Sequence, residues 1–183
     1  VTYATPLFWV GLMFIVVFAL NLGWFPTSGM ENIAMFYTGW DRVWDIAHHL
    51  VLPTITLSLF YLALYTRLMR ASMLEQAGMD YVTTARAKGL TERRIMFVHV
   101  LRNALLPVVT MAGVQVGALI GGSVIVESVF AWPGLGMLPF EALFSRDLNL
   151  LLGIFLLSAL LVVAVNLIVD IIYSWLDPRI EVA

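Results

Sequence analysis

Four long apolar runs constrain this chain more than any other feature of its sequence. They cover residues 6–24, 49–66, 104–126 and 148–175, and charged residues, glycines or prolines bound each of them. A helix needs about 20 mainly apolar residues to cross the hydrocarbon core of a bilayer. Backbone groups in lipid must satisfy one another, and a helix does this within one segment. The sequence therefore predicts an all-α integral membrane fold, a bundle of four transmembrane helices within a single domain over residues 1–183.

Composition excludes several classes of function. Hydrophobic residues make up 61% of the chain and charged residues only 12%, which is too apolar for a soluble domain. The absence of cysteine excludes disulfides, thiolate metal sites and cysteine nucleophiles. The chain also lacks a phosphate-binding GxxxxGK[ST] loop. We expect no enzyme activity, no catalytic residue, no cofactor or metal site in this chain, and no nucleic-acid partner.

Basic residues predict how the helices are oriented. Between the second and third runs lie Arg67, Arg70, Arg86, Lys88, Arg93, Arg94 and Arg102, and Arg179 follows the fourth. Only Arg42 and Arg146 fall on the other side. By the positive-inside rule, the loop 67–103 and the C-terminus are cytoplasmic, and the first span runs outward. Pro53 is expected in the first turn or two of the second span, where its missing N–H is tolerated.

The stretch DYVTTARAKGLTERR, residues 80–94, is compact, basic and rich in small residues. Asp80 is a suitable N-cap, Gly89 a left-handed helix stop, and Thr91 a cap for the helix that follows. This predicts a short helix about 12 Å long on the cytoplasmic side. Tyr81, Val82 and Ala85 share an apolar side of that helix.

Three interpretations of this helix compete. It can fix topology, it can lie on anionic lipid, or it can insert into a groove of another protein. A helix that lies on lipid is expected to carry bulky Trp or Phe anchors, and this segment has only Tyr81. The small Thr and Ala surface favours a protein partner.

Small and polar residues on the spans suggest where helices pack. Gly113, Gly117 and Gly121 recur every four residues along the third run, which allows close approach of another helix. Asn166 and Asp170 lie four apart near the inner end of the last run. Packing by hydrogen bonds is favoured for them over transport chemistry.

The outer side carries the candidates for a pore or gate. Gln115, Ser123 and Glu127 are spaced by eight and four residues, so they share a face if the third run is one helix. The segment AWPGLG contains Pro133 and Gly134 and must turn at the outer interface, where a re-entrant piece would gate a pore.

His48 and His49, together with Asp45, admit two interpretations. They are a set of potential metal ligands, or they are polar residues at a solvated membrane interface. Adjacent histidines on a helix point in different directions, so the interface is favoured.

Four stretches resemble one family. DYVTTARAKGLTERRIMFVHVLRNALLPVVT looks like the cytoplasmic EAA loop of ABC-transporter permeases of the peptide/nickel branch, which includes dipeptide and oligopeptide permeases. Similar matches are TPLFWVGLMFIVVFALNLGWFPTSG, ESVFAWPGLGMLPFEALFSRDLNLLLG and NLIVDIIYSWLDPRIEVA. Two features depart from the general EAA pattern: Thr83 and Thr84 stand in place of its Glu and first Ala, and the proline arrives late, as Pro107.

The resemblance implies a MetI-like permease fold and a pore-forming subunit of an ATP-driven importer in a bacterial or archaeal inner membrane. Its partners would be a second permease subunit in a heterodimer, two cytoplasmic ATPase subunits that bind the ATP, and an extracytoplasmic substrate-binding protein. The substrate would be a di- or oligopeptide, although nickel, glutathione and oligosaccharide importers share the scaffold. Further spans are expected before residue 1. The residues expected to couple to the ATPases are Asp80, Tyr81, Thr84, Ala85, Arg86, Ala87, Lys88 and Gly89.

A second class of function remains open at this stage. A four-span chain with glycine-rich packing is also compatible with half of a secondary transporter or a non-transporting membrane assembly subunit. Mid-membrane broken helices with an ionisable pair would favour the secondary transporter, and neither is evident in the sequence. Copurification of an ATPase would distinguish the classes.

Overall fold

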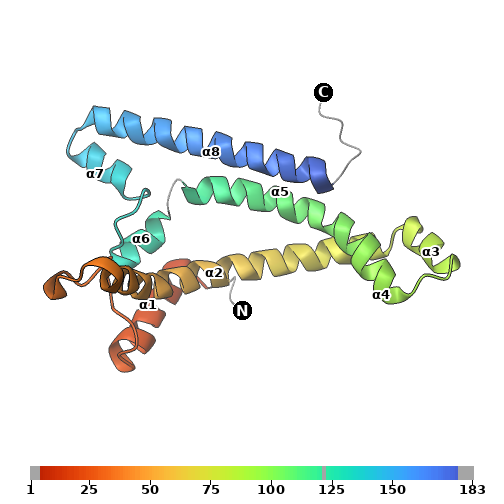
Figure 1. The fold of residues 1–183 in the computed structure, drawn as a ribbon, viewed down its shortest axis with the longest axis horizontal. Coiled ribbons are helices and arrows are strands. Elements are labelled where there is room, and N and C mark those ends of the chain that lie inside the picture. The colour runs from red at the N-terminus through yellow and green to blue at the C-terminus, as the bar shows by residue number, and fades with distance from the viewer. Residues whose placement is uncertain (1–4, 121–122, 177–183) are drawn as a thin grey trace. The chain divides into compact units, whose positions relative to one another are not determined.

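The computed structural model describes residues 5–120 and 123–176, and every regular element in these ranges is helical (Figure 1). The first apolar run forms α1 (Leu7–Phe14) and a π-helical turn, η1 (Ile15–Asn21). A short 3-10 turn, η2 (Ile33–Met35), precedes α2 (Gly39–Ala77). The remaining elements are α3 (Asp80–Ala87), α4 (Glu92–Arg94), η3 (Ile95–Val100), α5 (Leu101–Ile120), α6 (Val124–Phe130), α7 (Leu138–Phe144) and α8 (Leu148–Leu176).

The predicted all-α membrane fold is confirmed. In the described residues, Gly39–Ala77, Glu92–Val116 and Leu148–Val169 are long and apolar enough to cross a bilayer. The first run gives a shorter apolar helix, Leu7–Asn21. At 1.5 Å per residue, the 39 residues of α2 extend about 58 Å. This helix therefore exceeds both the hydrocarbon core and the predicted 49–66 span.

Pro53 does not lie where the sequence predicted. It sits inside α2, well beyond the first turns, because the polar segment from Gly39 to His49 is helical as well. The side chain of His49 bonds to the backbone of Asp45 one turn earlier, which supports the helix in this polar part. Because proline has no N–H, Pro53 donates no helical hydrogen bond to the backbone carbonyl of His49, four residues before it.

The third apolar run is not one continuous helix, which corrects the predicted 104–126 span. Helix α5 ends at Ile120, and Ser123 has a non-helical backbone (φ −104°, ψ 82°) before α6 starts at Val124. The sequence places Gly121 and Gly122 at this point, and each glycine disfavours helix by about 1 kcal/mol relative to alanine. Gln115 is therefore on a different helix from Glu127, and the predicted shared face does not exist.

The chain divides into two compact units. The first comprises Val1–Ala63 with Leu119–Ser158, and the second Leu64–Ala118 with Ala159–Ala183. Ala19, Leu52, Val126 and Phe130 form the buried centre of the first unit. There α1 approaches α6 closely at Gly11, where an added Cβ would lie 3.1 Å from the Val129 side chain.

Close contacts also connect the long helices of the second unit. The Ser72 hydroxyl of α2 donates a hydrogen bond to the Ala104 carbonyl of α5 at 3.0 Å. Helix α5 approaches α8 closely at the buried Gly113. A Cβ atom added there would lie 2.7 Å from a methyl group of Val169. Asn166 is exposed. Gly121, the surroundings of Gly117 and the side chain of Asp170 are not described by the structure, so the predicted packing roles of these residues stay predictions.

Candidate coupling helix and outer loop

Helix α3 begins one residue earlier than the sequence suggested. Its N-cap is Met79, whose backbone is extended (φ −77°, ψ 151°), and Asp80 is the first helical residue. The prediction of Asp80 as N-cap is therefore wrong, because the chain already leaves α2 at Gly78 and turns before Asp80. In the first turn the Asp80 carboxylate still complements the positive end of the helix dipole.

The end of α3 follows the prediction. Gly89 has a left-handed backbone (φ +77°), and its N–H donates to the Arg86 carbonyl at 2.9 Å. The N–H of Leu90 reaches back to the Ala85 carbonyl at 3.3 Å. Thr91 is the N-cap of α4, although its side chain makes no capping hydrogen bond.

One side of α3 is buried against its own chain. Val82 is fully buried and Ala85 is 8% exposed, and both belong to a cluster with Ile95 and Val100 of η3. Tyr81 adds a hydrogen bond from its hydroxyl to Oε1 of Gln76 at 3.0 Å. In Figure 1, α3 lies beside α4 beyond the end of α2.

This burial changes which residues are available to a partner. Ala85 was predicted to belong to the docking surface, but its side chain faces the η3 cluster. The exposed residues of the segment are Asp80, Thr83, Thr84, Arg86, Ala87, Lys88 and Gly89. We call Thr83, Thr84, Ala87 and Lys88 the outward face of α3.

Arg86 is already engaged by a neighbouring helix. Its Nε donates to Oε1 of Glu92 at 2.6 Å and its second amino group to Oε2 at 3.2 Å. This carboxylate raises the pKa of the Arg86 guanidinium above its ordinary value. The two side chains are 52% and 65% exposed, so solvent screening keeps the stabilisation small.

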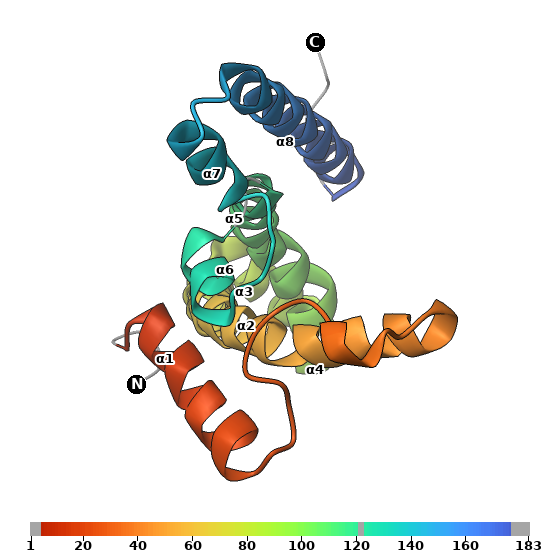
Figure 2. The same cartoon turned by 90° about the vertical axis from the view of Figure 1, so that its left-hand side faces the viewer.

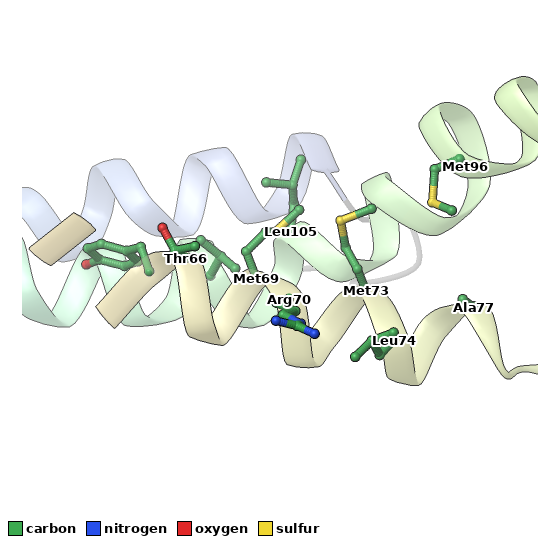
Figure 3. Close-up of a pocket in the computed structure, with 10 residues that line it drawn as sticks. Thr66, Met69, Arg70, Met73, Leu74, Ala77, Met96 and Leu105 are labelled. Carbon is green, nitrogen blue, oxygen red and sulfur yellow. The ribbon is translucent and has the colours of Figure 1, made fainter. Parts of the chain in front are cut away.

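An apolar groove runs along the second unit between the C-terminal half of α2 and the segment that starts α5. Its volume is about 690 Å³. Figure 3 shows Met69 and Met73 of α2 rising toward the segment that carries Met96 and Leu105. The sequence analysis missed this groove, although Met69 and Met73 lie one helical turn apart and Met is a common lining for adaptable apolar surfaces.

The loop of residues 131–137, called the outer loop for the side of the membrane that the sequence predicts for it, is organised around Glu127 of α6. Figure 2 shows this loop as the extended connection that leads from α6 to α7. The Glu127 carboxylate is buried and accepts the backbone N–H groups of Ser123 at 3.1 Å, Gly136 at 3.2 Å and Met137 at 2.8 Å. Glu127 was predicted as a pore or gate candidate on a face shared with Gln115 and Ser123, but its carboxylate points at the backbone donors of its own loop.

Two glycines of the outer loop fit around this carboxylate. A Cβ at Gly134 would overlap the Glu127 carboxyl group, and a Cβ at Gly136 would lie 3.0 Å from Glu127 Oε1. Pro133 is exposed. A hollow of about 670 Å³ adjoins the loop, with Trp132 and Glu141 among its lining residues.

The two histidines of α2 make backbone hydrogen bonds. His48 donates from Nε2 to the Trp24 carbonyl at 2.9 Å, and His49 from Nδ1 to the Asp45 carbonyl at 2.8 Å. Asp45 Oδ2 accepts the N–H of Asn32 at 2.6 Å. Within residues 5–120 and 123–176, no group of three metal-ligating side chains is close enough to hold an ion.

Comparisons with known proteins agree on one family. Residues 1–182 match the family described as binding-protein-dependent transport system inner membrane component. The chain is 48% identical over 178 residues to the oligopeptide transport system permease protein AppB of Bacillus subtilis, covering 97% of this chain and 55% of that protein. It is 43% identical to the di/tripeptide permease DppB of Pseudomonas aeruginosa, covering 98% of this chain and 57% of that protein. For the dipeptide permease DppB of Escherichia coli the identity is 42%, and the shares are 98% and 58%. The chain thus spans little more than half the length of these relatives.

Proposed function

We propose that this chain, which belongs to the family of binding-protein-dependent transport system inner membrane components, forms part of the substrate pathway of an ATP-driven importer of di- or oligopeptides. The observation that carries the proposal is the family match over residues 1–182, together with relatives named for peptide transport. The three helices of the described residues that are long and apolar enough to cross a bilayer, together with the shorter apolar helix Leu7–Asn21, would supply the membrane-crossing part.

We propose that partner subunits supply the energy for transport, as the family's description as one component of a transport system suggests. We propose two cytoplasmic ATPase subunits, a second permease subunit in a heterodimer, and an extracytoplasmic binding protein that delivers the peptide. The location is the inner membrane of a bacterium or archaeon. The loop 67–103 and the C-terminus face the cytoplasm, in line with the basic residues gathered there.

Helix α3 is proposed to dock on an ATPase subunit through its outward face. That face carries two threonines, an alanine and a lysine, which leave a smooth surface with one charge. The burial of its apolar side argues against α3 lying on lipid, because a helix that lies on lipid turns its apolar side toward the acyl chains. Here the apolar side, Val82 and Ala85, is covered by Ile95 and Val100.

The attachments of α3 make it suited to transmit movement. The Tyr81–Gln76 hydrogen bond connects it to the end of α2, and the Val82 cluster connects it to η3 at the start of the next long helix. The Ser72–Ala104 hydrogen bond links these two long helices further along. A force on α3 would therefore move the ends of both helices in the second unit together.

An exchange of Ala87 for tryptophan tests the docking. Ala87→Trp adds bulk on the outward face and leaves the buried side unchanged, so the helix should keep its position while the ATPase contact weakens. We expect the purified full-length complex to lose most of its peptide-stimulated ATP hydrolysis and to retain less ATPase. Ala71→Trp is the matched control, since Ala71 is exposed on α2 outside α3.

Two results would contradict the proposal. Full coupling in Ala87→Trp would rule out docking through the outward face. Failure of any ATPase to copurify with the wild-type subunit would rule out ATP-driven import and return half of a secondary transporter or an assembly subunit to consideration. Stimulation by nickel or oligosaccharide in place of peptides would change the substrate class alone.

A further inference from the structure

We infer that the buried Glu127 carboxylate is a positioning residue that holds the outer loop as a fixed rim at the outer mouth of the pathway, so that the loop does not open as a gate. Its place in transport depends on the proposed function. The clasp itself depends only on the geometry of the first unit.

The chemistry of the contacts supports a firm clasp. An ionised carboxylate only accepts hydrogen bonds, and all three of its neighbours here are backbone N–H donors. Hydrogen bonds from backbone N–H groups to a charged oxygen are among the stronger ones in proteins. Two of the donors, Gly136 and Met137, lie at the far end of the outer loop, so one side chain bonds both to the start of α6 and to the end of the loop.

The backbone of Glu127 closes the near end of the same loop. Its carbonyl accepts the N–H of Trp132 at 2.9 Å, and Ala131 adopts a left-handed backbone (φ +48°) to make the turn. Alanine rarely takes this conformation, so the surrounding contacts must impose it. The loop is thus tied to Glu127 at both of its ends.

The helix that carries Glu127 is itself held in place. Val126 and Phe130, on either side of it, are buried with Ala19 and Leu52. The Phe130 carbonyl accepts the N–H of Gly29 at 2.9 Å. A clasp on such an anchored helix restrains the loop relative to α1 within the first unit.

The loop also leaves little room for rearrangement around the carboxylate. The Cβ overlap at Gly134 shows that the backbone already lies against the carboxyl group. The Ser128 hydroxyl contacts Sδ of Met137 at 3.1 Å, which brings side chains of α6 and the loop end together. This last contact provides a place to lock the loop covalently.

The first experiment locks the loop. Ser128→Cys and Met137→Cys are combined in a cysteine-free full-length subunit, and a disulfide is formed in the assembled complex. A fixed rim predicts that peptide transport by the oxidised and reduced forms agrees within about twofold. A loss of more than about tenfold on oxidation, restored by reduction, would show that the loop must open and would overturn the inference.

The second experiment releases the clasp. In Glu127→Gln the amide NH₂ faces an N–H donor of the loop, so at least one hydrogen bond to the loop is lost. Such a loss from a buried group shifts the equilibrium between the held and the released loop by about tenfold or more. A reporter exchange, Leu135→Cys, places a thiol on the half-buried loop. We expect a membrane-impermeant thiol reagent to label it about tenfold faster with Glu127→Gln, whereas the control Glu141→Gln, an exposed carboxyl beside the same hollow, should leave the rate unchanged.

Rescue separates positioning from a general folding defect. If Glu127 acts by holding the loop, Glu127→Gln should lower peptide transport, and the Ser128–Met137 disulfide should restore it because the covalent bond replaces the lost hydrogen bonds. Unchanged labelling in Glu127→Gln, or no rescue by the disulfide, would overturn the inference. The labelling rate needs no transport, so it tests the clasp even if the complex proves to carry no peptide.

Discussion

Val82 allows the attachment of α3 to be tested quantitatively. Its side chain is fully buried against Ile95 and Val100. Val82→Ala removes two methyl groups, which at about 0.8 kcal/mol each is about 1.6 kcal/mol of lost transfer free energy. Incomplete collapse of the space left behind raises the cost to about 2 kcal/mol. Since 1.4 kcal/mol is a factor of ten, the equilibrium between attached and detached α3 should shift by about 30-fold.

Hydrogen exchange in the purified full-length complex measures this equilibrium. Amides of α3 that exchange when the helix detaches should lose about 30-fold of their protection in Val82→Ala. Thr83→Ala, at an exposed position next to it, should change protection by less than about threefold. Equal protection in Val82→Ala and wild type would refute the idea that this cluster holds α3 in place.

Other perturbations test the topology and the packing. Single cysteines at Lys88 and at Pro133 in a cysteine-free background should label from opposite sides of sealed vesicles, and labelling of both from outside would refute the orientation. Pro133 is chosen because it is exposed at the outer loop. Gly113→Ala forces a Cβ against α8 and should lower the free energy of unfolding by about 1–3 kcal/mol, which would appear as a lower melting temperature of the full-length subunit. An unchanged melting temperature would mean that the two helices separate easily. Arg86→Gln removes a largely exposed ion pair with Glu92 and should leave the melting temperature of the subunit nearly unchanged. A large loss of ATPase coupling with normal stability would therefore assign Arg86 to the partner contact.

Features with a local signal could be predicted from the sequence. Apolar run length predicted the three helices of the described residues that are long enough to cross a bilayer, and it overestimated the first run, which forms a shorter helix. The position of Gly89 between two helical patterns predicted the left-handed end of α3. The helical period of 3.6 residues also placed Tyr81, Val82 and Ala85 on one side of the predicted helix. The pattern did not indicate what covers that side. Ile95 lies on the following helix, and its distance from Val82 depends on the turn between the two helices.

The role of Glu127 had no such signal. An acidic residue at the end of an apolar run resembles a pore residue, and the apolar character of residues 104–126 led to the prediction of one helix, although Ser123 has a non-helical backbone. Its partners are backbone N–H groups nine and ten residues further on, at Gly136 and Met137. Nearly every residue carries such a donor, so no residue type marks these positions.

The contact between Gly113 and Val169 has a consequence for natural variation within the family. The two positions are 56 residues apart in the sequence, yet one has room only for hydrogen because the other is branched. An ancestor that gained a methyl group at position 113 would have been under selection to shorten the side chain at position 169, and the reverse change would relax that demand. Aligned relatives should therefore show paired exchanges at these two positions, with alanine or serine at the first accompanied by alanine or glycine at the second.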